Sequence, residues 1–291
     1  LSFEQKLSFE KDGFLTIPNA LSSGEVEELI DVCDLMVEEF NRESNHPYSQ
    51  RRDGMVQKKC FQSLITHEST LSIVAQLLSG NIHLHTTSII YKQPESQDDI
   101  GRRSWHRDIG MTQDLGHEGV VLAGIKVGYC LTEFIEPNSG MTLFAPGSHL
   151  LDTPLPIPRG QVDPVNAAEL TLKKGDAFLF ENRIFHTPAP NLSKSTAKVV
   201  IMGYSYRWMG GLKSNMDIVQ PSSKIVQNTD PMCQQLLGGE SNAIVEWIKK
   251  NDINVARTGR RAWRTVGPGL LTRLYHGQKW NDITILPSYL F

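Results

Sequence analysis

The sequence predicts a mainly β protein with flanking helices and an antiparallel jelly-roll core. Apolar residues recur at helical spacing over roughly the first 80 residues. From Ile82 onward, short β-rich runs are separated by turn residues, and strands do not alternate regularly with helices as they would around a parallel sheet. These observations favour an antiparallel sandwich or barrel that carries its helices outside, and a jelly roll fits best.

Length and composition are consistent with a single domain over residues 1–291. Of the residues, 40% are hydrophobic, which is enough for a well-filled core. We expect a helical N-terminal part at about 1–80, a jelly-roll core at about 82–210 and a C-terminal helical or loop extension at about 211–291.

The N-terminal part contains three predicted helices and one strand. Residues 3–11 are predicted to be helical up to Gly13, and residues 14–17 alternate as a short strand before Pro18. Ser22 and Glu25 form a capping box, after which apolar residues at helical spacing predict a helix to about residue 40. A further helical pattern covers about 69–78 and ends at Gly80.

Six β-rich runs form the predicted core, and the longer loops between them are expected to contact the substrate. The runs are 82–91, 120–132, 141–145, 169–172, 177–180 and 199–206, and the loops are 93–103, 110–119, 152–168 and 210–229. Turn residues such as Pro146-Gly147-Ser148 and Lys174-Gly175-Asp176 separate the runs.

Charge and cysteine content narrow the function classes. With 29 basic and 32 acidic residues, the chain has a formal charge of −3 and no basic excess for a phosphate backbone, so we expect no nucleic-acid partner.

We expect no membrane segment, because no apolar run is long enough to cross a bilayer and the first residues lack the order of a signal peptide. The scattered cysteines are expected to be reduced thiols in a cytoplasmic protein: Cys33, Cys60, Cys130 and Cys233. Nothing in the sequence indicates an oligomeric state.

The most informative motif is Ser104-Trp105-His106-Arg107-Asp108, considered together with His186. In an extended segment, His106 and Asp108 project from the same face. If His186 joins them from another strand, two imidazoles and one carboxylate occupy one face of a metal and leave three positions open. That arrangement is typical of non-heme Fe(II) oxygenases rather than of closed structural zinc sites.

Four motifs in this order give the chain a resemblance to a known family. They are the segment His106-Arg107-Asp108, the run 138–149 (NSGMTLFAPGSH), the turn 174–176 (KGD), and His186 followed by Pro190-Asn191-Leu192-Ser193. From about Phe9 to Trp208, the chain resembles the phytanoyl-CoA dioxygenase (PhyH-like) family of Fe(II)/2-oxoglutarate-dependent oxygenases.

The resemblance implies a double-stranded β-helix, that is, a cupin-like jelly roll. It implies Fe(II) held by His106, Asp108 and His186, which are also the expected catalytic residues, with 2-oxoglutarate and O₂ as cosubstrates. The expected reaction oxidises a small-molecule metabolite by hydroxylation, desaturation or cyclisation, and releases succinate and CO₂. Its expected context is a biosynthetic tailoring pathway. Because Asp108 is present, an oxygenase outcome is favoured over halogenation.

The chain departs from the family at the far carboxylate of 2-oxoglutarate. The resemblance places an arginine about one strand after the distal histidine, a position that here falls at Ala197. The nearest cation, Lys198, is the predicted replacement, with Arg207 as the second choice. By the same positional comparison, Ser88 and Tyr129 are expected to line the cosubstrate pocket.

Other histidines and other functions remain open. His149 is expected to stabilise a turn, and His83 with His85 would form a competing metal pair on a strand that brings no carboxylate beside them. Two alternatives to the oxygenase are a cupin-like metalloprotein that binds or isomerises a small molecule without 2-oxoglutarate, and a noncatalytic β-sandwich binding module.

Overall fold

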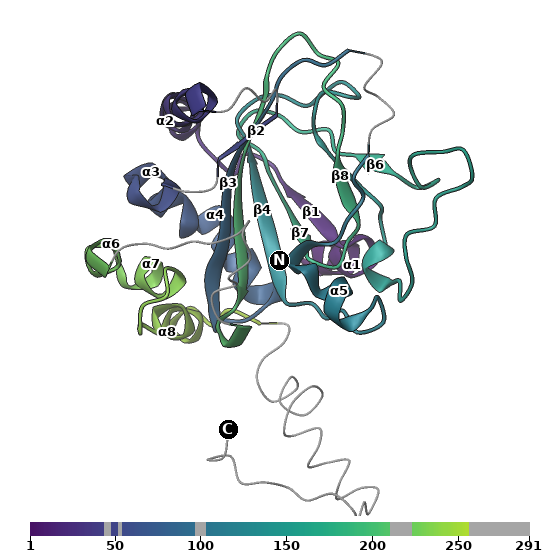
Figure 1. The fold of residues 1–291 in the computed structure, drawn as a ribbon. Coiled ribbons are helices and arrows are strands. Elements are labelled where there is room, and N and C mark those ends of the chain that lie inside the picture. Colours follow the sequence, from purple (N-terminus) through teal and green to yellow (C-terminus); the bar gives the residue numbers. More distant parts are fainter. Residues whose placement is uncertain (44–47, 52–53, 97–102, 210–222, 256–291) are drawn as a thin grey trace, which may run out of the picture.

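Two antiparallel sheets and a layer of helices make up the described part of the protein. The computed structural model describes residues 1–43, 48–51, 54–96, 103–209 and 223–255. Figure 1 shows the larger sheet in the middle, most of the helices on one side of it and the smaller sheet on the other. The predicted mainly β fold with flanking helices and a jelly-roll core is confirmed.

The larger sheet has six strands in the order β1-β7-β4-β9-β3-β2. All of its neighbouring pairs are antiparallel. Its strands are β1 (Phe14–Ile17), β2 (Tyr48–Arg51), β3 (Ile82–Lys92), β4 (Gly124–Cys130), β7 (Ala177–Glu181) and β9 (Ala197–Tyr206). Because β4 lies between β7 and β9, residues from distant parts of the sequence meet on one surface.

The smaller sheet has the order β6-β5-β8. It contains β5 (Thr142–Phe144), β6 (Ala168–Glu169) and β8 (His186–Pro188). Strand β8 begins with His186, one of the predicted metal ligands.

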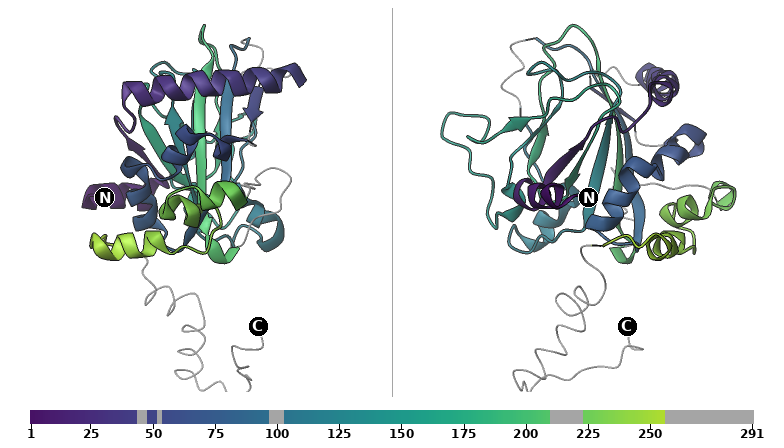
Figure 2. Two further views of the ribbon diagram at one scale, coloured as in Figure 1. Left: turned by 90° about the vertical axis from the view of Figure 1, so that its left-hand side faces the viewer. Right: turned by 180° about the vertical axis from the view of Figure 1, so that it is seen from behind.

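The helices lie mainly against the outer face of the larger sheet. In Figure 2, α2, α3, α4 and the three C-terminal helices cover that face, while α1 lies near its β1 edge. The helices are α1 (Phe3–Asp12), α2 (Ser23–Glu43), α3 (Lys59–Ile65), α4 (Glu68–Leu77), α5 (Met111–Leu115), α6 (Ser223–Gln227), α7 (Pro231–Leu236) and α8 (Ala243–Lys250). Short 3₁₀ helices occur at Met55–Gln57, Asp108–Gly110, Ser148–Leu150 and Arg207–Met209.

The larger sheet separates two apolar cores, because successive side chains of a strand point to opposite faces. We call the first the helix-side core, which includes Val127, Val200 and Met202 together with residues of the covering helices. The second, the inter-sheet core, includes Phe144 and Phe178 and lies between the two sheets. Both cores are built from buried side chains, and the metal-ligand candidates border the second.

Most predicted elements are present with small shifts at their ends. The strand at 14–17 has the predicted bounds, and the helix at 3–11 extends by one residue to Asp12. Four elements were not predicted: β2, α3, the short β8, and α5, which lies in the segment 110–119 that was expected to be a loop. The predicted extension at 211–291 lies partly outside the described residues, and its described part contains α6, α7 and α8.

None of the helices in the described ranges has both the length and the apolar character required to cross a membrane.

Candidate metal centre

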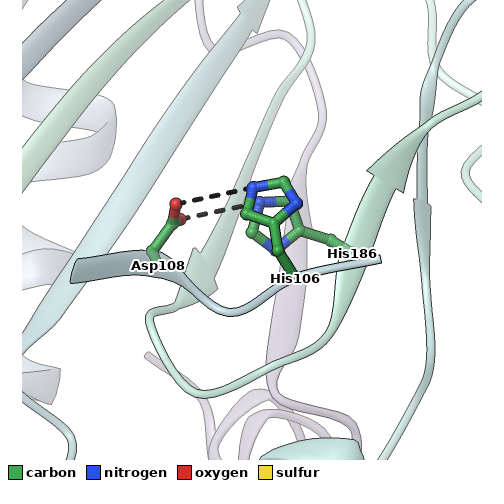
Figure 3. A group of neighbouring side chains, drawn as sticks. All are labelled: His106, Asp108 and His186. Carbon is green, nitrogen blue, oxygen red and sulfur yellow. Dashed lines mark ion pairs between the residues drawn. The ribbon is translucent and has the colours of Figure 1, made fainter. Parts of the chain in front are cut away.

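Three side chains from two distant segments gather on the inner side of the fold. His106, Asp108 and His186 each offer one ligand atom, and these atoms all lie within 4.8 Å of one another. Figure 3 shows the Asp108 carboxylate facing both imidazole rings. Among the described residues, this is the one group of three or more His, Cys, Asp or Glu side chains with such a spacing.

The two histidines are held opposite each other by their backbones. The His106 amide donates to the His186 carbonyl at 3.1 Å, and the His186 amide donates to the His106 carbonyl at 3.0 Å. This isolated antiparallel bridge puts both side chains on the same face, with ring centroids 4.4 Å apart. The bridge thereby pairs His106 directly with His186, which lies 80 positions later in the chain at the start of β8.

Hydrogen bonds select the nitrogen that each histidine presents to a metal. Nδ1 of His106 lies 2.7 Å from the Ser104 carbonyl oxygen, and Nδ1 of His186 lies 3.1 Å from the Ile184 carbonyl oxygen. A carbonyl only accepts, so we assign the ring proton of each neutral histidine to Nδ1. The lone pair then lies on Nε2, which in both rings is the nitrogen nearer to Asp108.

Asp108 is a buried carboxylate with a cation beside it. Lys126 on β4 donates from Nζ to Asp108 Oδ1 at 2.7 Å. Burial acts to raise the pKa of Asp108, but the charge of Lys126, assisted by His186, outweighs it and holds the pKa well below its usual range. The other oxygen, Oδ2, is buried and receives no hydrogen bond from the described residues. An anionic oxygen in this position is suited to a positive ion.

The site is buried on one side and open on the other. Side-chain exposure is 9% for Asp108 and 8% for His186, but 50% for His106. Burial lowers the pKa of His186 to about 4, although the Asp108 charge acts in the opposite direction. At neutral pH the site therefore presents a carboxylate and an uncharged His186, which are the protonation states that bind a metal.

Arg107, between the two ligands, fastens this segment to the neighbouring turn. Its guanidinium donates to the carbonyls of Ser148 and Leu151 at 2.8 and 2.7 Å. It also lies 4.4 Å above the centre of the Phe185 ring, next to His186. Side chains that flank both histidines are thus in contact with each other.

Asn182 is a second positioning residue that we did not predict. Its carbonyl oxygen accepts from the Asp108 amide at 3.0 Å. Its side-chain Oδ1 accepts from the amides of Ala123 and Gly124 at 2.9 and 3.1 Å, and its Nδ2 donates to the Val121 carbonyl at 3.1 Å. The sequence signal for this role was an asparagine four residues before His186. Asn182 is buried in the structure, where a polar side chain commonly forms hydrogen bonds with backbone groups.

The expectation that His106 and Asp108 share one extended strand is wrong in part. His106 lies in the isolated bridge and Arg107 is extended, but Asp108 begins a 3₁₀ helix. Ile109, the next residue, has a φ of 69°, which reverses the chain direction. The extended backbone at Arg107 thus places His106 and Asp108 on one face, and the chain turns away directly after Asp108.

Lys198 and Arg207 do not lie with the triad. Lys198 Nζ lies 2.7 Å from Asp34 Oδ1 on α2 and 4.9 Å from the centre of the Tyr91 ring, on the helix side of the sheet. The prediction for Lys198 is wrong because it has the same alternation on β9 as Val200 and Met202, which belong to the helix-side core.

Arg207 points to the C-terminal helices instead. Its guanidinium donates to the carbonyls of Gly239 and Ser241 and to the side chain of Asn242. These contacts are at the beginning of α8 and not at the triad.

Of the two predicted pocket-lining residues, Tyr129 is misplaced. Its hydroxyl lies 2.6 Å from Thr70 Oγ1 and donates to the Leu64 carbonyl, so the ring faces the helices. Ser88 on β3 faces the other side of the larger sheet, toward the smaller sheet. It is paired with Ile201 of the inter-sheet core and is buried. Its role at the cosubstrate remains a prediction.

The remaining histidines serve other contacts. His149 Nε2 lies 3.1 Å from the Glu10 carbonyl, which ties the 148–150 turn to α1. His83 Nε2 lies 2.7 Å from Ser205 Oγ, and His85 is buried on the same strand.

Comparison with known proteins gives one family match and one curated relative. The family model of phytanoyl-CoA dioxygenase (PhyH) matches residues 9–199. The dioxygenase cdmA of Talaromyces verruculosus is 28% identical over 135 residues, which cover 46% of this chain and 42% of that protein. The matched region thus spans less than half of the length of this relative.

Solved structures share the fold at low identity. The structure of HygX from Streptomyces hygroscopicus, with nickel and 2-oxoglutarate bound, has a TM-score of 0.55 and 17% identity, and the match covers 75% of this chain and 97% of that one. The 2-oxoglutarate-dependent epimerase SnoN from nogalamycin biosynthesis has a TM-score of 0.53 and 16% identity, with 74% and 94% covered. At this level of identity, the two structures establish the shared architecture.

Proposed function

Since this chain belongs to the phytanoyl-CoA dioxygenase family of Fe(II)- and 2-oxoglutarate-dependent oxygenases, we propose that it oxidises a small-molecule metabolite with O₂, releasing succinate and CO₂. The observation that carries the proposal is the triad: two Nε2 atoms and one carboxylate within 4.8 Å of one another. Two imidazoles and one carboxylate with open positions are the ligand set of non-heme Fe(II) oxygenases.

The residues present fit a ferrous ion. The buried Oδ2 of Asp108 lacks a donor among the described residues, and both imidazoles have their Nδ1 protons directed to carbonyls. We assign Fe(II) to His106, Asp108 and His186. When bound, Fe(II) and 2-oxoglutarate together supply the activation of O₂ and the electrons for substrate oxidation.

The protein's own residues orient the site and shield it. Arg107 and Asn182 fix the ligand segments through backbone carbonyls and amides. Phe180 lies 4.7 Å from the His186 ring between centroids and closes the buried side. The half-exposed His106 is on the open side, so we propose that the substrate approaches there and that its bond to be oxidised is selected by position.

A tailoring step in the biosynthesis of a small metabolite is the proposed context. HygX has been solved with hygromycin B bound, and SnoN comes from nogalamycin biosynthesis. These proteins share the fold of this chain and act on, or bind, compounds of that kind, and this supports the same substrate class here. A cytoplasmic location is also proposed, because all four cysteines are free thiols and a reducing compartment keeps iron ferrous.

Anaerobic titration with Fe(II) and 2-oxoglutarate tests the proposal. We expect the visible charge-transfer band of an oxo acid chelated to ferrous iron, and its loss in His186→Ala. His67→Ala is the matched control, because His67 contacts Ser69 and Glu25 away from the triad. Succinate release in the presence of candidate substrates then identifies the oxidised compound.

Two results would contradict the oxygenase assignment. Tight zinc or manganese binding without any response to 2-oxoglutarate would favour the cupin-like metalloprotein. Identical metal binding in wild type and in His186→Ala would show that the triad is not the metal site.

A further inference from the structure

Lys126 is a partly buried basic residue whose charge lies directly against the triad. On β4 it points to the inner side of the larger sheet, opposite to Ile125 and Val127, which belong to the helix-side core. Its side chain is 20% exposed, and its ammonium forms the 2.7 Å ion pair with Asp108. Neither Lys198 nor Arg207 has this orientation.

A dianionic oxo acid brings a second carboxylate into the site, and a buried carboxylate needs a cation. If a divalent ion, Asp108 and a dianion are combined, one negative charge remains. The positive charge of Lys126 balances it. Once a metal ion compensates Asp108, the ammonium is available to a second anion, and it has three donors to share.

We propose that Lys126 binds the far carboxylate of 2-oxoglutarate, in place of the cation expected at Ala197. This inference rests on the proposed function. The residues paired with Lys126 on the neighbouring strands are uncharged: Gly203 on β9 and Phe180 on β7. A flexible lysine can move from Asp108 toward the cosubstrate while it remains on the inner side of the sheet.

Among the lysines on the described strands of the larger sheet, Lys92 also faces this side, and its surroundings differ. It is paired with Ala197 across β3 and β9, six residues along β9 from Gly203. At about 3.3 Å per residue, this is roughly 20 Å along the strand from the row of Lys126. Its ammonium lies 3.0 Å from Glu95 and also donates to the Ala189 carbonyl, so its charge is already compensated.

The test compares two oxo acids that differ only at the far end. Binding of 2-oxoglutarate and of 2-oxopentanoate, which has a methyl group in place of the far carboxylate, is measured on the metal-loaded protein by calorimetry and by the anaerobic charge-transfer band. In Lys126→Met we expect the affinity for 2-oxoglutarate to fall on the order of tenfold to a hundredfold. The affinity for 2-oxopentanoate should stay within a few-fold of wild type, and metal affinity should be kept.

Matched variants locate the effect. Lys198→Met and Lys92→Met make the same substitution on the helix side and at the far end of the inner side, and both should keep the wild-type preference for the dicarboxylate. Lys126→Arg retains the charge and should keep most of that preference, which provides a second readout if the methionine variant is poorly folded.

Several outcomes would overturn the inference. If Lys126→Met weakens both oxo acids equally, the lysine acts only through Asp108. If the preference for 2-oxoglutarate is unchanged, or is lost in Lys92→Met instead, another group binds the far carboxylate. A wild-type protein that binds metal but no 2-oxoglutarate would overturn the proposed function together with this inference.

Discussion

At the scale of single residues, metal binding depends on the hydrogen bonds of the two triad histidines as much as on the histidines themselves. Ser104 and Ile184 contribute only backbone carbonyls, yet these carbonyls favour the neutral tautomer of His106 and His186 that has its proton on Nδ1 and its lone pair on Nε2. The residue types of the triad could be predicted from the sequence. The turn at Asp108 and the support from Asn182 could not, because both depend on contacts between segments distant in the sequence.

His149 should make the stability depend on pH. Burial lowers its pKa below the usual value, and its Nε2 lies against the Glu10 carbonyl while Nδ1 is buried without a partner in the described part of the chain. The unfolded chain therefore binds a proton more readily than the folded one, and stability is lost as the pH falls below about 6.5 toward the lowered folded value.

The measurement is urea unfolding between pH 5 and pH 7.5. We expect a smaller free energy of unfolding at the acidic end, and a flatter dependence in His149→Gln. His83 and His186, whose pKa values are also lowered by burial, should retain part of the slope in that variant. An unchanged slope in His149→Gln would contradict the explanation.

At the scale of elements, the end of α1 is fixed by a glycine with two separate constraints. Gly13 has a φ of 84°, and a Cβ there would lie 2.7 Å from His149 Nδ1. Gly238 has a φ of 90° with open space around it, and Gly24 has neither constraint. Gly13→Ala should therefore lose about 2–4 kcal/mol of unfolding free energy, and Gly238→Ala about 1–2 kcal/mol.

Gly24→Ala is the control and should be neutral or slightly stabilising, by up to about 1 kcal/mol. Thermal and urea unfolding of the three variants give the ranking. Equal losses for Gly13→Ala and Gly238→Ala would mean that His149 moves aside without cost.

Gln235 on α7 connects the helical layer to the larger sheet. Its buried Nε2 donates to the carbonyls of Gly80 and Ile82, and its Oε1 accepts from the Ile244 amide. Gln235→Met keeps the volume but leaves these groups without partners, so we expect a loss of about 1–3 kcal/mol. The exposed Gln227→Met should change stability by no more than about 0.5 kcal/mol.

Metal affinity of Gln235→Met should equal that of the wild type, since α7 packs into the helix-side core and the triad borders the inter-sheet core on the other face of the sheet. A coupled loss of metal affinity would show that the helical layer shapes the site.

Strand register explains which site residues could be predicted. The strand patterns indicated β3, β4 and β9, but the side of the sheet that a residue faces depends on pairing with other strands. Lys198 and Tyr129 therefore face the helices, while Lys126, in the middle of an otherwise apolar and glycine-containing strand, faces the triad. A lysine within such a run was the signal for a functional charge.

At the scale of the whole molecule, metal and cosubstrate should stabilise the fold in sequence. A metal that binds only the folded state at a hundredfold excess over its Kd adds about 2.7 kcal/mol. We expect Mn(II), used as an ion that does not react with O₂ as Fe(II) does, to raise the Tm, and 2-oxoglutarate to raise it further only when metal is present.

Calorimetric scans of wild type and His106→Ala check this order. The variant should unfold at the same temperature with and without Mn(II). A rise in the Tm with 2-oxoglutarate alone would indicate a cosubstrate site that does not depend on the triad.

The larger sheet also has a consequence for how this chain can diverge. Its strands carry the helix-side core on one face and the inter-sheet core with the triad on the other. Substitutions among the helices that preserve the helix-side core can therefore accumulate in a lineage while the chemistry is kept. Conversely, descendants can acquire a new substrate through the inner face and its loops while they inherit the helical layer intact.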